Sequence, residues 1–334
     1  MFSEREEWLN ETIEEPLEPF LPICDPHHHL WYGTENDYPI EALLRDISGG
    51  HRIRKTVFVE SSLMFNEKAS PEMQPVGETE FVGNLLRSKQ ESEMDTEIAA
   101  GIIGFADLTL GAKVAPVLEA HIAAERQRFR GIRHTAAWDA SPEVHSRRNT
   151  PPSLLMDRNF RRGFATLQRY NLSFDAWIYH PQLDELTDLA REFPDTSIIL
   201  NHVGGPLRIG PYASKLESAF REWQRSINEL AACDNVSVKL GGLGMRISGN
   251  NWDKAEKPPS STELAKAFEP YITWCIECFG VDRCMFESNF PVDKASYSYT
   301  ILWNAFKRLT ENLAQEDRLA LFYNTALKVY RLDD

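Results

Sequence analysis

Ile23-Cys24-Asp25-Pro26-His27-His28-His29-Leu30-Trp31 places three imidazoles and one carboxylate within five residues. If this stretch runs as a β-strand, successive side chains point to opposite faces. His27 and His29 then share a face with Asp25, and His28 points to the other face. Two neutral imidazoles on one face can bind a single divalent ion such as zinc. The remnant of a purification tag would stand at a terminus and not inside an Asp-Pro/Leu-Trp frame, so the stretch predicts a site.

The composition is that of a soluble globular protein. The 334 residues, 42% apolar and 26% charged, are enough for one large domain or two ordinary ones. The formal net charge of −14 argues against nucleic acid as a partner, because phosphate binding needs basic patches. No apolar run approaches the ~20 residues that cross a bilayer, which argues against a membrane protein.

The beginning of the chain is acidic. Residues 1–20 lack the basic start and apolar middle of a signal peptide, and their charge predicts a solvated N-terminal arm. We expect a single domain over residues 21–334. The acidic residues of the arm are Glu4, Glu6, Glu7, Glu11, Glu14, Glu15 and Glu18.

The five cysteines show no disulfide framework. An odd number without regular spacing, in a chain of this size, fits a reducing compartment and predicts a cytoplasmic protein. Cys275 and Cys278 have the CxxC spacing, but they fall in a helical segment and lack a second pair. They are better interpreted as core residues than as a metal or redox site.

Short β-rich runs alternate with helical segments along the chain. Eight such runs at this spacing predict a (β/α)8 TIM barrel. A doubly wound open sheet is the rival fold, but it calls for a glycine-rich turn after the first strand, where this chain has His-His-His-Leu-Trp-Tyr-Gly. The runs are Ile23–Leu30, Lys55–Glu60, Ile98–Phe105, Phe129–His134, Leu172–Tyr179, Ser197–Val203, Val236–Leu240 and Cys284–Phe290.

The intervals contain helices and two polar segments. Ala140–Ser153 and Arg246–Thr262 lack apolar periodicity and follow β-runs, which predicts loop insertions on the C-terminal face of the barrel; plain surface loops are the alternative. The expected helices are Glu78–Met94, Val114–Gln127, Asn159–Arg169, Leu183–Glu192, Lys215–Ala232, Leu264–Cys278 and Ile301–Ala326.

Polar residues gather where the predicted strands end. The C-terminal ends of the strands line the active site of such a barrel. Five of the nine histidines fall there, which a random distribution would not favour. The residues at these ends are His27, His29, Glu60, Asp107, Arg133, His134, His180, His202, Lys239, Glu287 and Asn289.

Several of these motifs resemble a known family. Asp25-x-His27-x-His29, His180, Asn-His-Val-Gly-Gly-Pro at 201–206 and Ser-Asn-Phe-Pro at 288–291 look like the amidohydrolase superfamily, over roughly residues 20 to 330. Phe129–His134 and His180–Leu183 look like its amidohydrolase-related branch. That branch includes L-fuconolactone hydrolase, 4-sulfomuconolactone hydrolase and 2-pyrone-4,6-dicarboxylate lactonase. The resemblance implies the barrel and a hydrolase.

The resemblance also implies roles for individual residues. His27, His29 and His180 correspond to metal ligands for a single divalent ion, zinc or manganese, and His202 to the acid/base histidine. The family has an aspartate that binds the metal and activates water where this chain has Asn289. An amide cannot take a proton at neutral pH.

That departure leaves two alternatives open. Another carboxylate replaces the aspartate, with Glu287, two residues before Asn289, the nearest candidate and Asp293 and Asp25 next. Otherwise the site operates without a metal, because the loss of an anionic ligand weakens metal binding. A structural ion pair is the alternative role of Glu287.

The resulting hypothesis is hydrolysis of a lactone or similar ester of a small, anionic, sugar-derived or aromatic-derived acid. His202, Glu287 and Asn289 form the catalytic set, and a homo-oligomer is compatible with the sequence. Decarboxylation or hydration on the same scaffold, or a catalytically inactive binding barrel, are the alternatives. The residues expected to bind the substrate are Trp31, Arg133, His134, Trp138 and Lys239.

Overall fold

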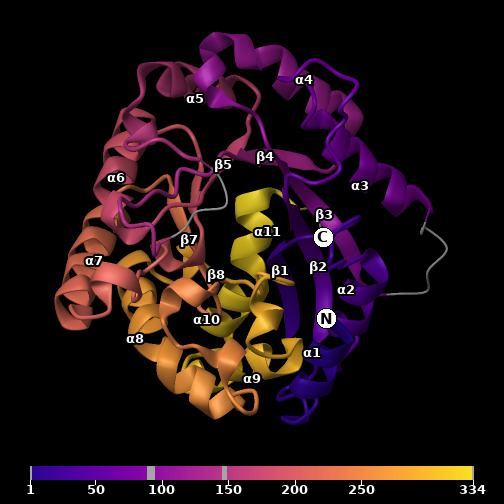
Figure 1. The fold of residues 1–334 in the computed structure, drawn as a ribbon, viewed down its shortest axis with the longest axis vertical. Coiled ribbons are helices and arrows are strands. Elements are labelled where there is room, and N and C mark those ends of the chain that lie inside the picture. Colours follow the sequence, from indigo (N-terminus) through magenta and orange to yellow (C-terminus); the bar gives the residue numbers. More distant parts are fainter. Residues whose placement is uncertain (1, 89–94, 145–148, 333–334) are drawn as a thin grey trace.

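The structure is a computed structural model that describes residues 2–88, 95–144 and 149–332. Eight parallel strands follow one another around a barrel in sequence order (Figure 1). The last strand returns to the first, where His29 N donates to Phe290 O at 2.7 Å and Asn289 N donates to His27 O at 2.9 Å. The predicted (β/α)8 barrel is therefore confirmed. The strands are β1 (Pro22–His28), β2 (Arg52–Val59), β3 (Glu97–Gly104), β4 (Phe129–Arg133), β5 (Ser173–Ala176), β6 (Ile198–Leu200), β7 (Val236–Leu240) and β8 (Cys284–Phe286).

Helices cover the outside of the barrel (Figure 1). Side-chain caps begin three of the described helices: Asp157 accepts from two backbone N–H groups at the start of α5, Ser260 and Glu263 form a capping box at the start of α8, and Ser298 accepts from Ile301 N at the start of α9. The helices are α1 (Phe2–Leu9), α2 (Ile40–Ile47), α3 (Val76–Ser88), α4 (Ala115–Ala124), α5 (Arg158–Arg169), α6 (Leu183–Glu192), α7 (Leu216–Ala231), α8 (Ser261–Phe279), α9 (Tyr299–Leu309), α10 (Gln315–Leu319) and α11 (Thr325–Tyr330).

Three strands are shorter than the sequence predicts. The apolar runs continue past β5, β6 and β8, but the backbone leaves the sheet soon after each strand. His202 and Val203 after β6 and Asn289 after β8 have φ values of 55°, 47° and 56°. This left-handed region is costly for residues other than glycine and ends a strand. His202 and Asn289 therefore lie where the chain leaves the sheet, after β6 and β8.

The C-terminal helix differs from the prediction. The expected single helix Ile301–Ala326 is broken into α9, α10, a π-helical turn over Ala320–Asn324, and α11. Thr310 Oγ1 donates back to the Phe306 carbonyl at 2.9 Å, and Leu313 N donates to Thr310 O, which turns the chain. After this turn, α11 packs into the base of the barrel, where Leu327 and Tyr330 lie among Val57, Ile199 and other strand residues.

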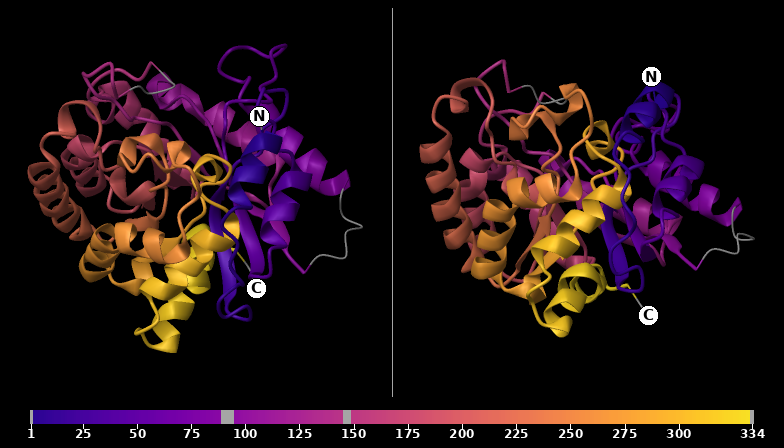
Figure 2. Two further views of the ribbon diagram at one scale, coloured as in Figure 1. Left: turned by 60° about the horizontal axis from the view of Figure 1, so that its bottom comes forward. Right: turned by 90° about the horizontal axis from the view of Figure 1, so that it is seen from below.

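The acidic arm lies against the barrel, although Glu7, Glu11, Glu15 and Glu18 stay exposed to solvent. α1 and the segment after it lie along the barrel, with the two termini toward opposite ends of it (Figure 2). Glu14 accepts from Ser261 at the start of α8, and Lys307 on α9 donates to the carbonyls of Leu17 and Glu18. Lys294 pairs with Glu6 at 2.6 Å. Three glutamates of the arm thus have partners on the barrel: Glu6 with Lys294, Glu14 with Ser261, and Glu18 with Arg318.

The remaining segments agree in part with the sequence analysis. Arg246–Thr262 follows β7 and carries two short 3-10 turns, and the described part of Ala140–Ser153 follows β4. Residues 89–94 of the expected helix Glu78–Met94 and residues 145–148 of the first insertion lie outside the described residues. Within the described part of the chain, no helix has the length and apolar character needed to cross a bilayer.

Candidate active site

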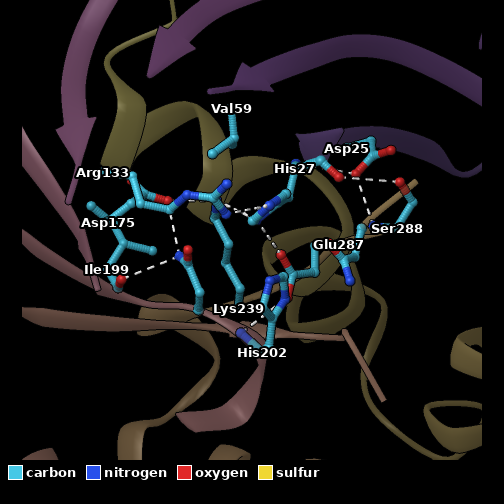
Figure 3. A network of polar contacts seen from close by, with 12 residues as sticks. Asp25, His27, Val59, Arg133, Asp175, Ile199, His202, Lys239, Glu287 and Ser288 are labelled. Atoms are coloured by element: carbon cyan, nitrogen blue, oxygen red, sulfur yellow. Dashed lines mark hydrogen bonds and ion pairs between the residues drawn. The ribbon is translucent and has the colours of Figure 1, made fainter. Parts of the chain in front are cut away.

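A bulge in β1 sets the directions of its polar side chains. The pairing of β1 with β2 shifts register between Asp25 and His28, so strict alternation fails in this stretch. His28 turns to Thr56, with its Nε2 2.9 Å from Thr56 Oγ1. Asp25 lies beyond His27, next to Ser288 and away from Arg133 (Figure 3), and it accepts from Ser288 N and Tyr299 OH. The expectation that Asp25 shares the face of His27 is therefore wrong.

His27 and His29 remain close to each other. Their ring centroids are 5.0 Å apart in an edge-on arrangement, and the His27 ring is also 4.6 Å from that of His202. His29 Nδ1 lies 2.8 Å from Val59 O. Because a carbonyl oxygen only accepts, Nδ1 carries the ring proton and Nε2 carries the lone pair.

His202 and Glu287 form a buried pair at the ends of β6 and β8 (Figure 3). Glu287 Oε1 accepts from His202 Nδ1 at 2.7 Å and from the backbone N–H of His202 at 3.1 Å. The second oxygen, Oε2, is 2.8 Å from His27 Nδ1. The carboxylate thus orients the imidazole of His202 and leaves its Nε2 as the basic nitrogen, which is the arrangement of a general base.

Gly242 explains how His202 fits there. Its φ of +67° is unfavourable for other residues, and a Cβ at this position would lie 2.4 Å from His202 Cγ. The His202 ring packs edge-on against Trp177 at 4.8 Å on its other side. The imidazole is held between a glycine and an indole, so its orientation is fixed.

Burial shifts the pKa values of this pair in opposite directions. Burial raises the pKa of Glu287 to about 8, and this effect outweighs the opposite effects of Lys239 and of the backbone N–H of His202. It holds the pKa of His202 and of His27 well below the usual value, with Arg133 and Lys239 adding to the effect. Both rings are therefore neutral at neutral pH, and Glu287 titrates close to that range.

Arg133 belongs to the same network but is already paired. Its Nε donates to Glu60 Oε1 at 2.8 Å and its NH2 group to Glu60 O at 2.7 Å. NH1 lies 3.3 Å from His27 Nε2. Since a guanidinium only donates, this nitrogen of His27 is the acceptor and the ring proton is assigned to Nδ1, which faces Glu287.

Lys239 is fully buried inside the barrel and bound within the protein. Its Nζ donates to Asp175 Oδ2 at 2.7 Å and lies 3.2 Å from His27 Nδ1 (Figure 3). Asp175 also accepts from Asn201 and from the hydroxyl of Tyr330. The sequence analysis expected Lys239 to bind the substrate; in the structure its ammonium pairs with Asp175.

Asn289, in the place of the expected aspartate, is held by a carboxylate. Its Nδ2 donates to Asp293 Oδ1 at 2.9 Å. The other oxygen of Asp293 accepts from Gly244 N and Tyr297 OH. Burial raises the pKa of Asp293 to about 7. Asp293 thus fixes the orientation of the Asn289 amide.

His180 lies apart from this network, after β5. Leu207 N donates to its Nδ1 at 3.1 Å, so the ring proton is on Nε2. Nε2 is buried and lacks a hydrogen-bond partner among the described residues. Its ring packs against Tyr212, whose hydroxyl donates to Asp139 at 2.7 Å. His180 therefore offers an unused N–H donor.

The other predicted binding residues lie at the ends of β1 and β4. His134 Nδ1 accepts from Leu108 N at 3.2 Å, and its ring packs against Phe105 and Phe160, which separates it from the Arg133 network. Trp31 and Trp138 are half-buried after β1 and β4. Of the predicted residues, the structure brings together His27, His29, Arg133, His202, Lys239 and Glu287.

The residues that could hold a metal differ from the predicted set. In the described residues, one group of three potential ligands has all its ligand atoms within 4.8 Å of one another: His27, His202 and Glu287. His29 and His180 are outside this group. Two imidazoles and a carboxylate suit zinc in kind.

The charges around this group suit a cation poorly. The lone pair of His27, on Nε2, faces Arg133 NH1 at 3.3 Å, and Lys239 Nζ lies 3.2 Å from the other ring nitrogen. A divalent ion would have to displace the guanidinium and stand beside a second cation. The residues therefore do not fit a metal in this arrangement, and no catalytic step is derived through one.

Asp175 and Tyr330 belong to the network although neither was predicted from the sequence. Asp175 stands in the apolar run Phe174-Asp175-Ala176. A lone carboxylate in a buried strand needs a partner, and this would have indicated a polar network in the barrel. Tyr330 gives no such signal, because its position under the barrel depends on the path of the chain after α9.

Comparison with known proteins gives consistent matches. A sequence model of the amidohydrolase family matches residues 24–332. An uncharacterised protein of Sinorhizobium fredii is 33% identical over 327 residues, 93% of this chain and 99% of the relative. An L-fucono-1,5-lactonase of Burkholderia multivorans is 24% identical over 319 residues, 93% of this chain and 96% of the relative.

Solved structures share the fold. A crystal structure of an amidohydrolase from Burkholderia multivorans with bound HEPES has a TM-score of 0.72 at 22% identity and covers 93% of this chain and 99% of its own. A crystal form of such an amidohydrolase with bound zinc has a TM-score of 0.69 at 23% identity, with the same coverage.

Proposed function

Because the chain belongs to the amidohydrolase family, we propose that it hydrolyses a lactone, or a similar ester, of a small anionic acid derived from a sugar or an aromatic compound. The observation that carries the proposal is the buried His202–Glu287 pair, with 2.7 Å between Nδ1 and Oε1. The relative named L-fucono-1,5-lactonase supports the lactone class.

In this mechanism His202 acts on water. Nε2 takes a proton from a water molecule as its oxygen attacks the lactone carbonyl, and Glu287 stabilises the imidazolium that forms. The tetrahedral intermediate then collapses, the ring C–O bond breaks, and His202 returns the proton to the departing oxygen. The product is the open hydroxy acid, and His202 and Glu287 are restored to their starting state.

Donors are needed for the charge that develops on the carbonyl oxygen. His180 offers a buried Nε2–H without a partner among the described residues, and Arg133 has guanidinium N–H groups beyond those that bind Glu60. Fixed donors of this kind stabilise an oxyanion strongly in a buried site. His29, whose Nε2 carries a lone pair, can accept from a substrate hydroxyl.

The rim after β4 and β5 fits a polar substrate. Trp138 is half-buried there, and Tyr212 donates to Asp139 beside His180. An aromatic wall with a few fixed polar groups is common in pockets for small molecules. We assign substrate contact to Trp31 and Trp138 by their position at the strand ends, and a supporting role to His134.

A lactone screen tests the proposal. Purified protein is incubated with sugar-acid lactones and with muconate-type lactones in a weakly buffered solution, and acid release is followed by a pH indicator. Hydrolysis of at least one lactone, lost in a His202→Asn variant, is the expected result. Release of CO2 from aromatic carboxylic acids without lactone hydrolysis would instead indicate decarboxylation, and binding without turnover would indicate an inactive barrel.

A further inference from the structure

The last residue of α11 reaches the interior of the barrel. Tyr330 is fully buried, and its hydroxyl lies 3.1 Å from Asp175 Oδ1 and 2.9 Å from Asp175 Oδ2. Around it, Ala326 and Leu327 of the same helix pack with strand residues such as Cys24 and Met285. The C-terminal helix thus closes the base of the barrel and also presents a hydroxyl to a buried carboxylate.

Asp175 connects this hydroxyl to the candidate active site. Its Oδ2 accepts from Lys239 Nζ at 2.7 Å and from Asn201 Nδ2 at 2.9 Å. Lys239 Nζ is in turn 3.2 Å from His27 Nδ1, and it lies 5.2 Å from the centre of the Tyr330 ring. Contacts therefore run from α11 through Asp175 and Lys239 to His27.

The residues that link Tyr330 to His27 are buried, so each hydrogen-bond donor among them affects the positions of the others. Asp175, Lys239 and Tyr330 are all shielded from water, so a donor that is lost is not replaced by solvent. A lysine ammonium is a compact charge on a flexible stem, and its position depends on the groups that bind it. A change in Asp175 therefore moves the ammonium relative to His27, whose Nδ1 also faces Glu287 at 2.8 Å.

We propose that Tyr330 is a positioning residue: through Asp175 and Lys239, its hydroxyl fixes the His27 side of the His27–Glu287–His202 group. The effect on turnover rests on the proposed function. The effect on the state of the His27 ring does not, so the two are measured separately.

The chain contains a matched control. Tyr38 is also buried and its hydroxyl donates to Asp46, which pairs with Lys294 at 2.7 Å; Lys294 Nζ lies 5.5 Å from the centre of the Tyr38 ring. This second Tyr–Asp–Lys group has the same chemistry and lies at α2, where Lys294 also pairs with Glu6 of α1. Tyr38→Phe removes the same hydroxyl as Tyr330→Phe.

The first readout is kinetic. For the lactone that the protein hydrolyses, we expect Tyr330→Phe to lower kcat by roughly 10-fold to 100-fold, the cost of a small misplacement of catalytic groups, with KM nearly unchanged. We expect Tyr38→Phe to keep the wild-type kcat although its melting temperature falls by a similar amount. Equal kcat values in the two variants would overturn the proposal.

The second readout needs no substrate. The ring nitrogens of the histidines are observed by NMR in protein labelled with 15N-histidine, and the His27 signals are identified by their loss in His27→Gln. We expect Tyr330→Phe to shift the His27 signals and Tyr38→Phe to leave them in place. Unshifted His27 signals in Tyr330→Phe would overturn the proposal even if no lactone is hydrolysed.

A second variant serves if Tyr330→Phe does not fold. Asp175→Asn keeps the shape of the side chain and removes its charge, so that Lys239 loses its counter-ion. The same shift of the His27 signals is expected in this variant. His27 signals identical to those of the wild type would contradict the link from Asp175 to His27.

Discussion

At the scale of single residues, the chemistry of the site depends on which nitrogen of each histidine carries a proton. His202 donates from Nδ1 to Glu287, His29 faces Val59 O with Nδ1, and His180 accepts at Nδ1. His202 and His29 therefore carry a lone pair on Nε2, and His180 carries a proton on Nε2. Three histidines that look alike in the sequence therefore have different tasks.

Replacing His202 tests the base directly. We expect His202→Asn to lower turnover by at least ~100-fold, because loss of a general base removes that much of the acceleration. The measurement is kcat for the best lactone of the screen. His121→Asn is the control, since His121 is equally buried but binds Thr79 and Phe105 O away from the site. Wild-type turnover in His202→Asn would contradict the assignment.

Replacing Glu287 tests whether its ionisation causes the pH dependence of kcat. Burial raises the pKa of Glu287 to about 8, so the carboxylate fraction, and with it the support of the His202 imidazolium, increases as the pH rises through that value. We expect kcat to rise with pH through about 8 in the wild type, where it is half-maximal, and to be low and flat in Glu287→Gln. The pH–rate profile is the measurement.

The control for this profile is another buried acid. Burial raises the pKa of Glu78 to about 7, but Glu78 binds Ser61 and Leu63 and stays outside the His202 pair. Glu78→Gln is expected to keep the rising limb near pH 8. If Glu287→Gln also keeps the rising limb, a group other than Glu287 is responsible for the pH dependence of kcat.

Removal of metal ions tests the charge argument. The lone pair of His27 faces Arg133, and Lys239 stands beside the same ring. We therefore expect turnover to be unchanged after treatment with a chelator, and metal analysis to find less than one zinc per chain. Loss of turnover on chelation, restored by added zinc, would show that Arg133 moves aside to admit an ion.

At the scale of elements, polar residues of α9 hold the N-terminal arm to the barrel. Lys307 donates to the carbonyls of Leu17 and Glu18 and to His51 Nδ1, and burial lowers its pKa to about 8. Asn304 on the same helix accepts from Leu17 N and donates to Glu15 O, and the Glu18 carbonyl also accepts from Leu21 N. Lys307 and Asn304 therefore hold the arm to α9 together.

Lys307→Met tests this attachment. The variant keeps the length of the side chain and removes its donors, so buried carbonyls lose their partner. We expect faster hydrogen exchange of the backbone amides in residues 12–21, measured by mass spectrometry, than in the wild type. Lys328→Met, which changes an exposed lysine on α11, should exchange as the wild type does. Equal exchange in both variants would contradict the attachment.

The order of strands and helices could be predicted from the sequence, but the ends of several of these elements could not. The apolar runs of β2 and β7 are set by local sequence, and both strands were found within a few residues. The bulge in β1 and the left-handed residues after β6 and β8 lie where distant segments meet, as the bonds between Asn289 and His27 and between Glu287 and His202 show. The side-chain directions of Asp25 and Asn289 follow from these contacts, so they could not be predicted from the sequence.

At the scale of the whole molecule, buried ionisable groups of both signs limit the pH range of stability. Burial lowers the pKa of His28, His51, His121 and His180 to about 4 and raises those of Glu78, Asp293 and Glu287 to between about 7 and about 8. The two groups act at opposite ends of the range.

Whether stability rises or falls with pH depends on which state, folded or unfolded, binds more protons. Between about pH 4 and the unfolded histidine pKa of about 6.5, the unfolded chain binds more protons at these histidines, so stability rises with pH. Above the unfolded acid pKa of about 4.3, the folded chain binds more protons at the buried acids, so their contribution is lost as the pH rises through about 7 to 8. Thermal unfolding from pH 4 to 9 should therefore show a maximum near pH 6 to 7. A melting temperature that rises steadily to pH 9 would contradict this.

The place where the barrel closes also has a consequence for its motions. The two backbone bonds that join the last strand segment to the first, from His29 to Phe290 and from Asn289 to His27, flank the segments that carry His27 and Glu287. Any transient opening of that seam separates the partners of the proton-handling group at the same moment. Opening of the backbone at this seam would therefore interrupt the contacts that the proposed reaction needs, so a variant whose seam opens more often should turn over more slowly.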